Sequence, residues 1–379
     1  MKNDKFFCDK FLVKETEYGT GKTFIIAELG TAHGGDVAKA DELIAAAAES
    51  GADCLKFQMV YADEILHKNT GEVALPGGSI RLYDRFKKLQ QPLSFFAHLK
   101  EKTEKAGLVF LCTPFGLKSA KEIFSLSPDC LKIASPELNY NALLREIASF
   151  KLPVFLSTGV SKLGDIEQAL GALSPYDSTP NTPVCLLHCV TSYPAPETDY
   201  NLRVMGNLAA IFGVPVGVSD HSMDCELVPA LAASVGAAAI EKHFCLSQDD
   251  DGLDDPIALP PDQFARMVKA VRTAEKNGAA KTISALEQER GVDFVQRVLG
   301  DGIKRLAASE AGNYGLTNRS VHALLDIQKG EIIQKEMIRC LRSEKNLRAG
   351  LPPEWEQRII GRRALNFIPA GEGIRFQDI

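Results

Sequence analysis

Short apolar runs alternate with longer segments of helical periodicity through the first 277 residues of the chain. Each run is almost continuously apolar, which is typical of strands buried on both faces of a parallel sheet. The eight runs span residues 23–29, 53–58, 108–115, 130–135, 153–159, 183–190, 214–220 and 237–244. The segments between them, such as AKADELIAAAAESGA, carry apolar residues at helical spacing and a glycine near the end. The pattern therefore predicts eight consecutive strand–helix units.

Eight such units close most naturally into a TIM (β/α)8 barrel of about 250 residues. A doubly wound open sheet is the alternative architecture. It is disfavoured because the units are regular and no GxGxxG dinucleotide motif follows the first strand. We therefore predict an α/β fold whose first domain, residues 1–277, is a TIM barrel.

The regular alternation stops after residue 277. Residues 278–315 are polar and helical in character, and we predict a helical linker there. From residue 316 to residue 379, short strand-like pieces alternate with turns such as QKGE. This pattern predicts a small second domain. A domain of this size often needs a partner for its stability.

Composition narrows the classes of partner. Apolar residues make up 45% of the chain and charged residues 24%, which is ordinary for a soluble globular protein. The net charge of -6 provides no basic field for nucleic acid or for an anionic membrane surface. No apolar run approaches the roughly 20 residues that span a bilayer, and the charged start MKNDKFFCDKFLVKE does not look like a signal peptide. Nine cysteines without a CxxC pair suit free thiols in a reducing cytoplasm, so we expect a cytoplasmic protein.

Polar residues gather where the predicted strands end. In a TIM barrel the active site lies at the carboxyl ends of the strands. Side chains alternate along a strand, so Glu241 and His243 share a face, as do Ser219 and His221. Any one of these residues could be an ordinary rim residue. The set recurs at one end of almost every predicted strand: Glu28, Lys56, Gln58, Thr113, Lys132, Ser135, Glu137, Ser157, Thr158, Tyr193, Ser219, Asp220, His221, Glu241 and His243.

Two chemical roles suit these side chains. His221 and His243 end neighbouring strands, which lie about 4.8 Å apart, so their imidazoles could hold one divalent cation with open coordination positions. Such a cation would act as a Lewis acid rather than as a structural metal. Lys56 and Lys132, with hydroxyl groups between them, predict a pocket for a phosphate and a carboxylate.

Several motifs in order and at characteristic spacing resemble the sialic acid synthases. These enzymes condense phosphoenolpyruvate with an N-acetylated amino sugar. The matching stretches are AELGTAHGG, KFQ, CTPF, KIASPE, STG, HCVTSYPAP, VSDHS, EKHF and GLDDPIAL, followed by VLGDGIKR and NRSVHALLDIQKGEII in the tail. The resemblance implies a TIM barrel followed by an antifreeze-like (SAF, β-clip) domain at residues 316–379.

The resemblance also implies roles for individual residues. Lys56, Thr113, Lys132, Ser135, Ser157 and Ser219 match positions that bind phosphoenolpyruvate, and Thr191 stands where the family commonly has an asparagine with that role. His221 and His243 match the metal ligands, usually of manganese, with magnesium or cobalt as alternatives. Glu28, Glu137 and Asp254 match groups near the reacting carbons, and Gln58 and Tyr193 match groups near the sugar.

Arg319 in the tail matches an arginine that one subunit places over the active site of the other. The resemblance therefore implies a domain-swapped homodimer in which Arg319 binds the sugar. The ordinary alternative is that Arg319 is a solvated surface charge, as most single arginines are.

Three departures from the family pattern bear on the sugar more than on the chemistry. Ala32 stands where the family usually has asparagine, Thr191 replaces another asparagine, and residues 275–297 resemble an insertion. N-acetylmannosamine, its 6-phosphate and the diacetamido trideoxyhexoses all suit the family, so the acceptor stays open.

Three other functions are compatible with parts of this pattern. A 3-deoxy-heptulosonate or octulosonate phosphate synthase would use the same phosphoenolpyruvate chemistry but would not need the tail domain. A metal-dependent aldolase would use the same barrel and cation without releasing phosphate. A sugar-binding protein with a decayed barrel would need neither the cation nor the phosphoenolpyruvate pocket. The retained Lys56, Lys132, His221 and His243 argue against this alternative.

Overall fold

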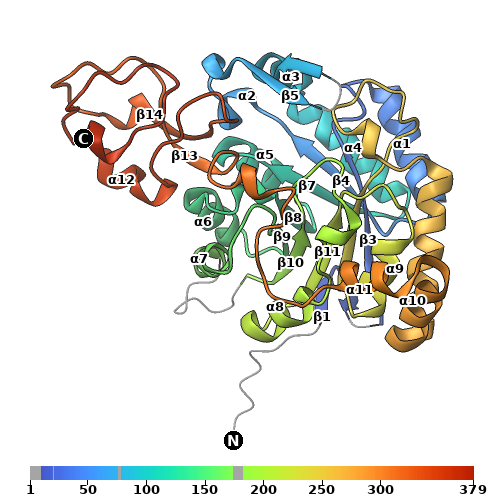
Figure 1. The fold of residues 1–379 in the computed structure, drawn as a ribbon. Coiled ribbons are helices and arrows are strands. Elements are labelled where there is room, and N and C mark those ends of the chain that lie inside the picture. The colour runs from blue at the N-terminus through green and yellow to red at the C-terminus, as the bar shows by residue number, and fades with distance from the viewer. Residues whose placement is uncertain (1–9, 20, 76–77, 174–181) are drawn as a thin grey trace, which may run out of the picture.

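Eight parallel strands form a closed barrel in the computed structural model, which describes residues 10–19, 21–75, 78–173 and 182–379 (Figure 1). The strands are β3 (Phe24–Gly30), β4 (Cys54–Met59), β7 (Val109–Pro114), β8 (Cys130–Ile133), β9 (Val154–Ser157), β10 (Val184–Cys189), β11 (Val216–Asp220) and β12 (Ala239–His243). Each strand lies within or overlaps one of the eight predicted apolar runs. The last strand, β12, pairs with β3 and closes the barrel. The predicted TIM barrel is therefore confirmed.

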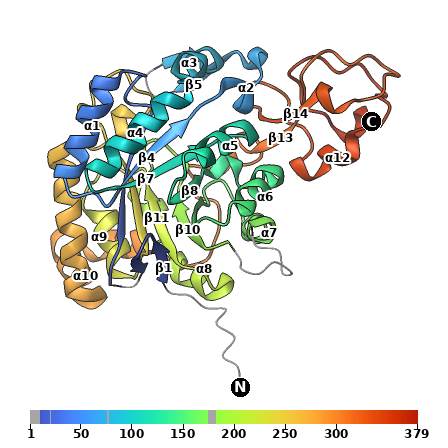
Figure 2. The same cartoon turned by 180° about the vertical axis from the view of Figure 1, so that it is seen from behind.

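Helices follow every barrel strand and cover its outer surface (Figures 1 and 2). They are α1 (Val37–Glu49), α2 (Ala62–Ile65), α3 (Leu82–Leu89), α4 (Leu93–Lys105), α5 (Leu117–Ser125), α6 (Asn141–Ser149), α7 (Leu163–Leu173), α8 (Val204–Phe212), α9 (Leu227–Ser234) and α10 (Pro261–Arg290). A hairpin of β5 (Glu72–Leu75) and β6 (Gly78–Arg81) lies between α2 and α3. The first helix begins where the Asp36 carboxylate accepts hydrogen bonds from the backbone N–H groups of Ala38 and Lys39.

A second hairpin packs against the amino-terminal end of the barrel interior. It consists of β1 (Lys10–Val13) and β2 (Thr16–Gly19). Phe11 lies with its ring centroid 4.8 Å from that of Phe155, which in turn stacks on Phe24 at 5.5 Å. Apolar packing therefore fills the interior at this end, and the polar strand-end residues lie at the other.

The register of the parallel strands sets those polar residues side by side. Glu28 on β3 is the pairing partner of Lys56 on β4 and, on its other side, of His243 on β12. Ser219 on β11 pairs in the same way with Glu241 on β12. Residues paired in register lie at the same height of the barrel, so the sequence positions of the strand ends alone bring these groups together.

The chain leaves the barrel through α10, which is interrupted at Gly278 by a non-helical backbone conformation (φ 72°, ψ 174°). The predicted boundary between residues 277 and 278 falls at this interruption. After α11 (Val292–Leu299), an extended segment runs to the C-terminal domain. That domain contains the antiparallel strands β13 (Arg319–Ala323) and β14 (Ile338–Arg342) and the short helix α12 (Glu356–Ile359), and it lies beside the loops at the carboxyl ends of β4, β7 and β8 (Figure 1).

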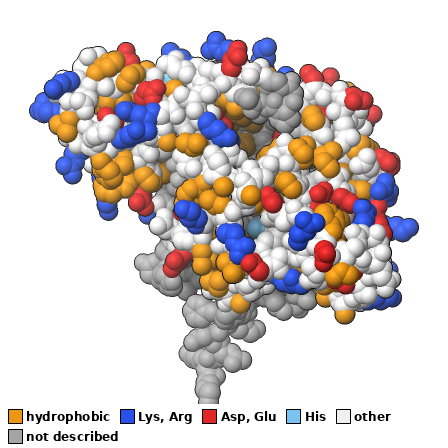
Figure 3. Space-filling model, viewed as in Figure 1, with side chains coloured by type: hydrophobic (Ala, Val, Ile, Leu, Met, Phe, Trp, Pro, Cys, Tyr) orange, Lys and Arg blue, Asp and Glu red, His pale blue; other side chains and the backbone are white. Residues whose placement is uncertain are grey.

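Basic and acidic side chains are interspersed on the face of the molecule shown in Figure 3. Of the helices within the described ranges, none combines the length and apolar character needed to cross a bilayer. The eight cysteines that the structure describes are free thiols, and all are buried. The location of the protein in the cell stays a prediction.

Candidate active site

Two buried lysines alternate with two buried carboxylates at the carboxyl end of the barrel. Lys56 Nζ lies 3.1 Å from Glu28 Oε1 and 3.2 Å from Glu241 Oε1. Lys132 Nζ lies 3.8 Å from the other Glu241 oxygen and donates to Ser157 Oγ at 2.7 Å. All four charged side chains are almost fully excluded from solvent. Their charges therefore interact more strongly than they would in water, because the dielectric constant around them is low.

Burial and mutual attraction act in opposite directions on these groups. Burial lowers the pKa of Lys132 to about 8, although Glu241 opposes the change. Burial also disfavours the charge on Lys56, but Glu241 and Glu28 outweigh it and raise the pKa of Lys56. Burial similarly disfavours ionised Glu241, yet Lys132 and Lys56 lower the pKa of that carboxyl to about 2. At neutral pH an anionic ligand would therefore meet two ammonium groups that are already removed from bulk water.

The two predicted metal-binding histidines lie together, with ring centroids 5.7 Å apart. His221 Nδ1 is 2.8 Å from the carbonyl oxygen of Val190, which fixes the proton on Nδ1 and leaves the lone pair on Nε2. Burial, and next the neighbouring His243, lower the pKa of His221 to about 3. His221 therefore presents a neutral imidazole, which is the form that binds a metal ion.

Two further predicted residues border this pair. The Tyr193 ring stacks on His221 at 4.3 Å, and its hydroxyl lies 3.2 Å from His221 Nε2. Asp254 Oδ2 lies 3.9 Å from His243 Nδ1. Within the described ranges, no group of three or more His, Cys, Asp or Glu side chains is arranged to bind a metal ion. Two imidazoles alone would leave coordination positions open to water and substrate, and a cation held by His221 and His243 stays a prediction.

A group of small and hydroxyl-bearing residues lies beside Lys132. We call it the cradle, and it consists of Ser135, Ser157, Gly159 and Thr191. Ser135 Oγ accepts a hydrogen bond from the backbone N–H of Gly159 at 3.0 Å. Thr191 Oγ1 is buried and has no hydrogen-bond partner in the part of the chain that the structure describes, and the same holds for Thr113 Oγ1, which lies outside the cradle on β7, in register with Gln58. A Cβ atom on Gly159 would lie 2.1 Å from Thr191 Oγ1 and 3.0 Å from Ser135 Oγ, so only glycine fits between them. Buried hydroxyls without partners favour a bound polar ligand.

The remaining predicted positions complete one continuous set of contacts. Gln58 Nε2 donates to Glu28 Oε1 at 2.6 Å, and Ser219 Oγ donates to Glu241 Oε1 at 3.1 Å. The residues joined in this way are Glu28, Lys56, Gln58, Lys132, Ser157, Tyr193, Ser219, Glu241 and His221, with His243 and Asp254 beside them.

Glu241 was not assigned a role from the sequence, although it links both lysines. The available signal was its position two residues before His243, on the same face of β12. Lys242, between them, points away from the interior and forms a buried ion pair with Asp220 at 2.7 Å. Of the charged strand end EKH, Glu241 and His243 therefore face the barrel interior, and Lys242 faces the surrounding helices. A second unpredicted residue is Lys304, whose Nζ donates to the carbonyl oxygen of Thr158 at 3.1 Å from within the predicted linker.

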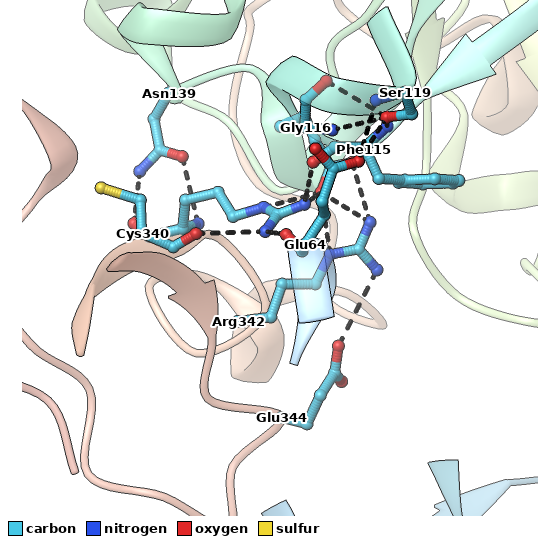
Figure 4. A network of polar contacts seen from close by, with 10 residues as sticks. Glu64, Phe115, Gly116, Ser119, Asn139, Cys340, Arg342 and Glu344 are labelled. Carbon is cyan, nitrogen blue, oxygen red and sulfur yellow. Dashed lines mark hydrogen bonds and ion pairs between the residues drawn. The ribbon is translucent and has the colours of Figure 1, made fainter. Parts of the chain in front are cut away.

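Glu137 and Arg319 belong to a separate buried network that joins the barrel to the C-terminal domain. Figure 4 shows this network and labels Glu64 and Phe115 on the barrel side and Arg342 on the side of the C-terminal domain. The Glu137 carboxylate lies 2.8 Å from Arg319 Nη2, and it accepts from Arg342 Nη2 at 2.7 and 2.8 Å. Arg319 is only 1% exposed, so it is not a solvated surface charge. On the barrel side, the Glu64 carboxylate binds the first turn of α5 through the backbone N–H of Lys118 at 2.7 Å.

The Arg319 guanidinium is also held by carbonyl oxygens of its own chain. It donates to Phe115 at 2.7 Å, to Cys340 at 3.2 Å and to Glu64. These contacts with Glu137 and the carbonyls engage all the nitrogen atoms of the side chain. Sugar binding by Arg319, and its delivery to a second subunit, stay predictions.

We expect Arg319→Ala to lower the free energy of unfolding of the C-terminal domain by about 3 kcal/mol, because the change leaves part of a buried carboxylate and several carbonyls without donors. Arg342 stays bound to Glu137, so we expect a loss at the lower end of the roughly 3–5 kcal/mol that is typical when one partner of a buried ion pair is removed. Trp355, the single tryptophan of the chain, lies in this domain, so its fluorescence during urea unfolding reports the change. Arg362→Ala removes an exposed guanidinium from the same domain and should leave the urea midpoint unchanged. Equal midpoints for both variants would contradict the structural role of Arg319.

Two family matches cover most of the chain. Residues 43–282 match the NeuB family, and residues 318–379 match the SAF domain. The chain is 34% identical to the spore coat polysaccharide biosynthesis protein SpsE of Bacillus subtilis, over 94% of this chain and 93% of that protein. The crystal structure of that protein superposes with a TM-score of 0.80 at 32% identity, covering 98% of this chain and 99% of that one. The chain is also 33% identical to the N,N'-diacetyllegionaminic acid synthase of Legionella pneumophila, over 94% of each chain.

Proposed function

We propose that this chain, which belongs to the NeuB family, condenses phosphoenolpyruvate with an N-acetylated amino sugar to give a nine-carbon 2-keto sugar acid and phosphate. The resemblance to sialic acid synthases drawn from the motifs is confirmed at the level of the family. The observation that carries the proposal is the pair of buried lysines, Lys56 and Lys132, at the same end of the barrel as buried hydroxyls without partners and the paired histidines His221 and His243. Relatives named as synthases of legionaminic and pseudaminic acid support the same class of product.

In this proposal phosphoenolpyruvate binds across the two lysines. Lys56 on β4 and Ser219 on β11, which both contact Glu241 Oε1, would bind its carboxylate, with Thr113 on β7, the strand next to β4. The phosphate would lie in the cradle, beside Lys132 and the hydroxyls of Ser135, Ser157 and Thr191. Charge-assisted hydrogen bonds from desolvated donors are the strong ones, which suits a ligand with separate anionic groups.

The condensation would form a bond between carbon 3 of phosphoenolpyruvate and carbon 1 of the open-chain sugar, so positive charge develops at carbon 2 of phosphoenolpyruvate. A carboxylate is the natural stabiliser of that charge. Glu28 is favoured over Glu137 because one Glu28 oxygen has no partner in the described residues, whereas two arginines already neutralise Glu137. Water would then add to carbon 2, oriented by Asp254, and the adduct would lose phosphate.

His221 and His243 are the residues that would hold a divalent cation, with manganese as the first candidate and magnesium or cobalt next. When bound, such a cation supplies Lewis-acid polarisation of the sugar aldehyde. The neutral state of His221 and its orientation by the Val190 carbonyl support this assignment. Gln58 and the partly exposed Tyr193 would contact the sugar on the solvent side.

We further propose the domain-swapped homodimer. Exchange of an identical domain preserves its contacts, so the Arg319–Glu137 pair would form between subunits as it does within one chain. Light scattering would give the number of subunits. Mixing Arg319→Ala chains with His221→Ala chains would restore activity only if one active site draws on both.

Release of phosphate from phosphoenolpyruvate tests the proposed reaction. We expect release that depends on one sugar of a panel containing N-acetylmannosamine, its 6-phosphate and the diacetamido trideoxyhexoses. Release with four- or five-carbon aldose phosphates instead would indicate a heptulosonate or octulosonate phosphate synthase. Condensation of pyruvate without phosphate release would indicate an aldolase. Sugar binding with no turnover of either acid would indicate a binding protein.

We expect kcat/KM for phosphoenolpyruvate to fall as the pH rises above about 8. The lowered pKa means that Lys132 is charged below pH 8 and neutral above it, so the contribution of this cation to anion binding is present at low pH and lost at high pH. The fall should approach about tenfold per pH unit. Lys132→Arg keeps its charge throughout the range and should lose this alkaline limb, whatever its absolute rate. The same limb in both proteins would assign it to another group.

A further inference from the structure

The segment from Lys304 to Asn318, called the strap here, crosses the loops that follow β9 and β10 on its way to the C-terminal domain. Those loops carry Gly159 and Thr191, which belong to the cradle described above. The strap contributes polar side chains at several points of the crossing. Its sequence lies outside the strands and between the barrel and the second domain, so no strand-end pattern draws attention to it.

Glu310 is the central residue of the strap. Its side chain is buried, with 1% of the residue exposed. One carboxylate oxygen accepts the backbone N–H of Val160 at 2.9 Å and that of Thr191 at 2.8 Å. The other oxygen accepts the N–H of Ala307 in the strap at 3.2 Å. A single carboxylate therefore joins the β9 loop, the β10 loop and the strap.

Two asparagines of the strap bind the carbonyl groups of the same two loop residues. Asn318 Nδ2 donates to the carbonyl oxygen of Val160 at 3.3 Å, and Asn313 Nδ2 donates to that of Thr191 at 3.1 Å. The backbone N–H and C=O of both residues are thus bound by the strap. The Thr191 side chain is left with a buried hydroxyl that has no partner among the described residues.

Val160 has a conformation that needs such support. Its φ of 41° lies in the left-handed region, which β-branched residues rarely adopt.

Behind the strap lies a cavity of about 540 Å³, lined in part by His188, Lys304 and Glu310. Along this wall the strap is therefore fixed by hydrogen bonds more than by apolar packing.

We infer that Glu310 is a positioning residue for the phosphate group of the substrate. It holds the loops of Gly159 and Thr191 at the separation that the cradle requires, and it does so without contacting the ligand. The inference rests on the proposed function, since the phosphate is that of phosphoenolpyruvate. Because the strap continues directly into Arg319, the docking of the C-terminal domain and the shape of the cradle depend on one continuous segment.

The test compares Glu310→Ala with Glu310→Gln. Alanine removes all three acceptor contacts, so the dissociation constant for phosphoenolpyruvate, measured by calorimetry, should rise by about 30-fold. The KM for phosphoenolpyruvate should rise in parallel, while the KM for the sugar changes less than about threefold. Glutamine keeps one oxygen for both loop N–H groups and should recover most of the affinity. Amide hydrogen exchange at Val160 and Thr191 should accelerate together in the alanine variant.

Glu275→Gln is the matched control. Glu275 is another partly buried carboxylate that accepts a backbone N–H, from Thr23 at 2.7 Å, but at the amino-terminal end of the barrel. This variant should keep the affinity for phosphoenolpyruvate even where it unfolds at lower urea.

Two outcomes would overturn the inference. The first is an alanine variant that binds phosphoenolpyruvate as the wild type does. The second is a variant in which kcat and both KM values change equally, as in a general loss of structure. If the wild-type chain does not bind phosphoenolpyruvate, the proposed function has failed. The role of Glu310 in holding the loops is then judged by exchange of the two amides alone, and unchanged exchange would reject it.

Discussion

Replacing His221 by alanine is expected to lower kcat by about a thousandfold or more, since the change removes one of two protein ligands of the proposed Lewis acid. The fold should survive, because the His221 side chain makes polar contacts with Val190 and Tyr193 rather than belonging to the apolar core. His243→Ala should have an effect of similar size. Initial rates after chelator treatment, with and without added manganese, give the measurement: the cation should restore the wild type and neither variant.

His98→Ala is the control for this experiment. His98 lies on α4 at the outer surface, where it contacts Asp41, and its loss should leave the response to manganese unchanged. Near-normal activity of chelator-treated His221→Ala protein would mean that the reaction uses a different site.

Replacing Lys56 by methionine is expected to weaken phosphoenolpyruvate binding by about a hundredfold. It should also lower the free energy of unfolding by about 3 kcal/mol, because Glu28 and Glu241 are left facing each other in a buried site without the cation between them. The position of Lys56 between two carboxylates adds this second effect to the first. Calorimetry of phosphoenolpyruvate binding and urea unfolding followed by circular dichroism measure the two separately.

Lys121→Met provides the comparison for Lys56→Met. Lys121 lies on the exposed face of α5 and makes only a long ion pair with Glu146, at 3.8 Å. Neither binding nor stability should change in that variant. A Lys56→Met protein with unchanged affinity for phosphoenolpyruvate would remove the pocket proposed here.

The barrel and most of its polar end could be predicted from the sequence because both depend on short-range patterns. Strands buried on two faces produce continuous apolar runs, and the residue that follows each run must lie at the carboxyl end of the barrel. The alternation of side chains then placed Glu241 and His243 on one face, and the register of β12 beside β3 brought His243 next to Glu28.

The contacts that escaped prediction join residues far apart in the chain. Glu310 reaches Thr191 across 119 residues, and Arg319 reaches Glu137 across 182. No local periodicity marks such pairs, and the strap has neither strand nor regular helix to locate it. The tail arginine was identified through the family motif, but its buried partners on the barrel could be seen only in three dimensions.

The position of Lys56 also has a consequence for how the chain folds during synthesis. Its two counter-charges come from the first and the last strands of the barrel, and β12 cannot pair with β3 until residue 243 has left the ribosome. At roughly 5–20 residues per second, the nascent chain carries Lys56 for about 10 to 40 seconds before Glu241 exists. During that interval the strands already made have an open edge on each side, so the step that completes the charge pairing is also the step that removes the exposed edges.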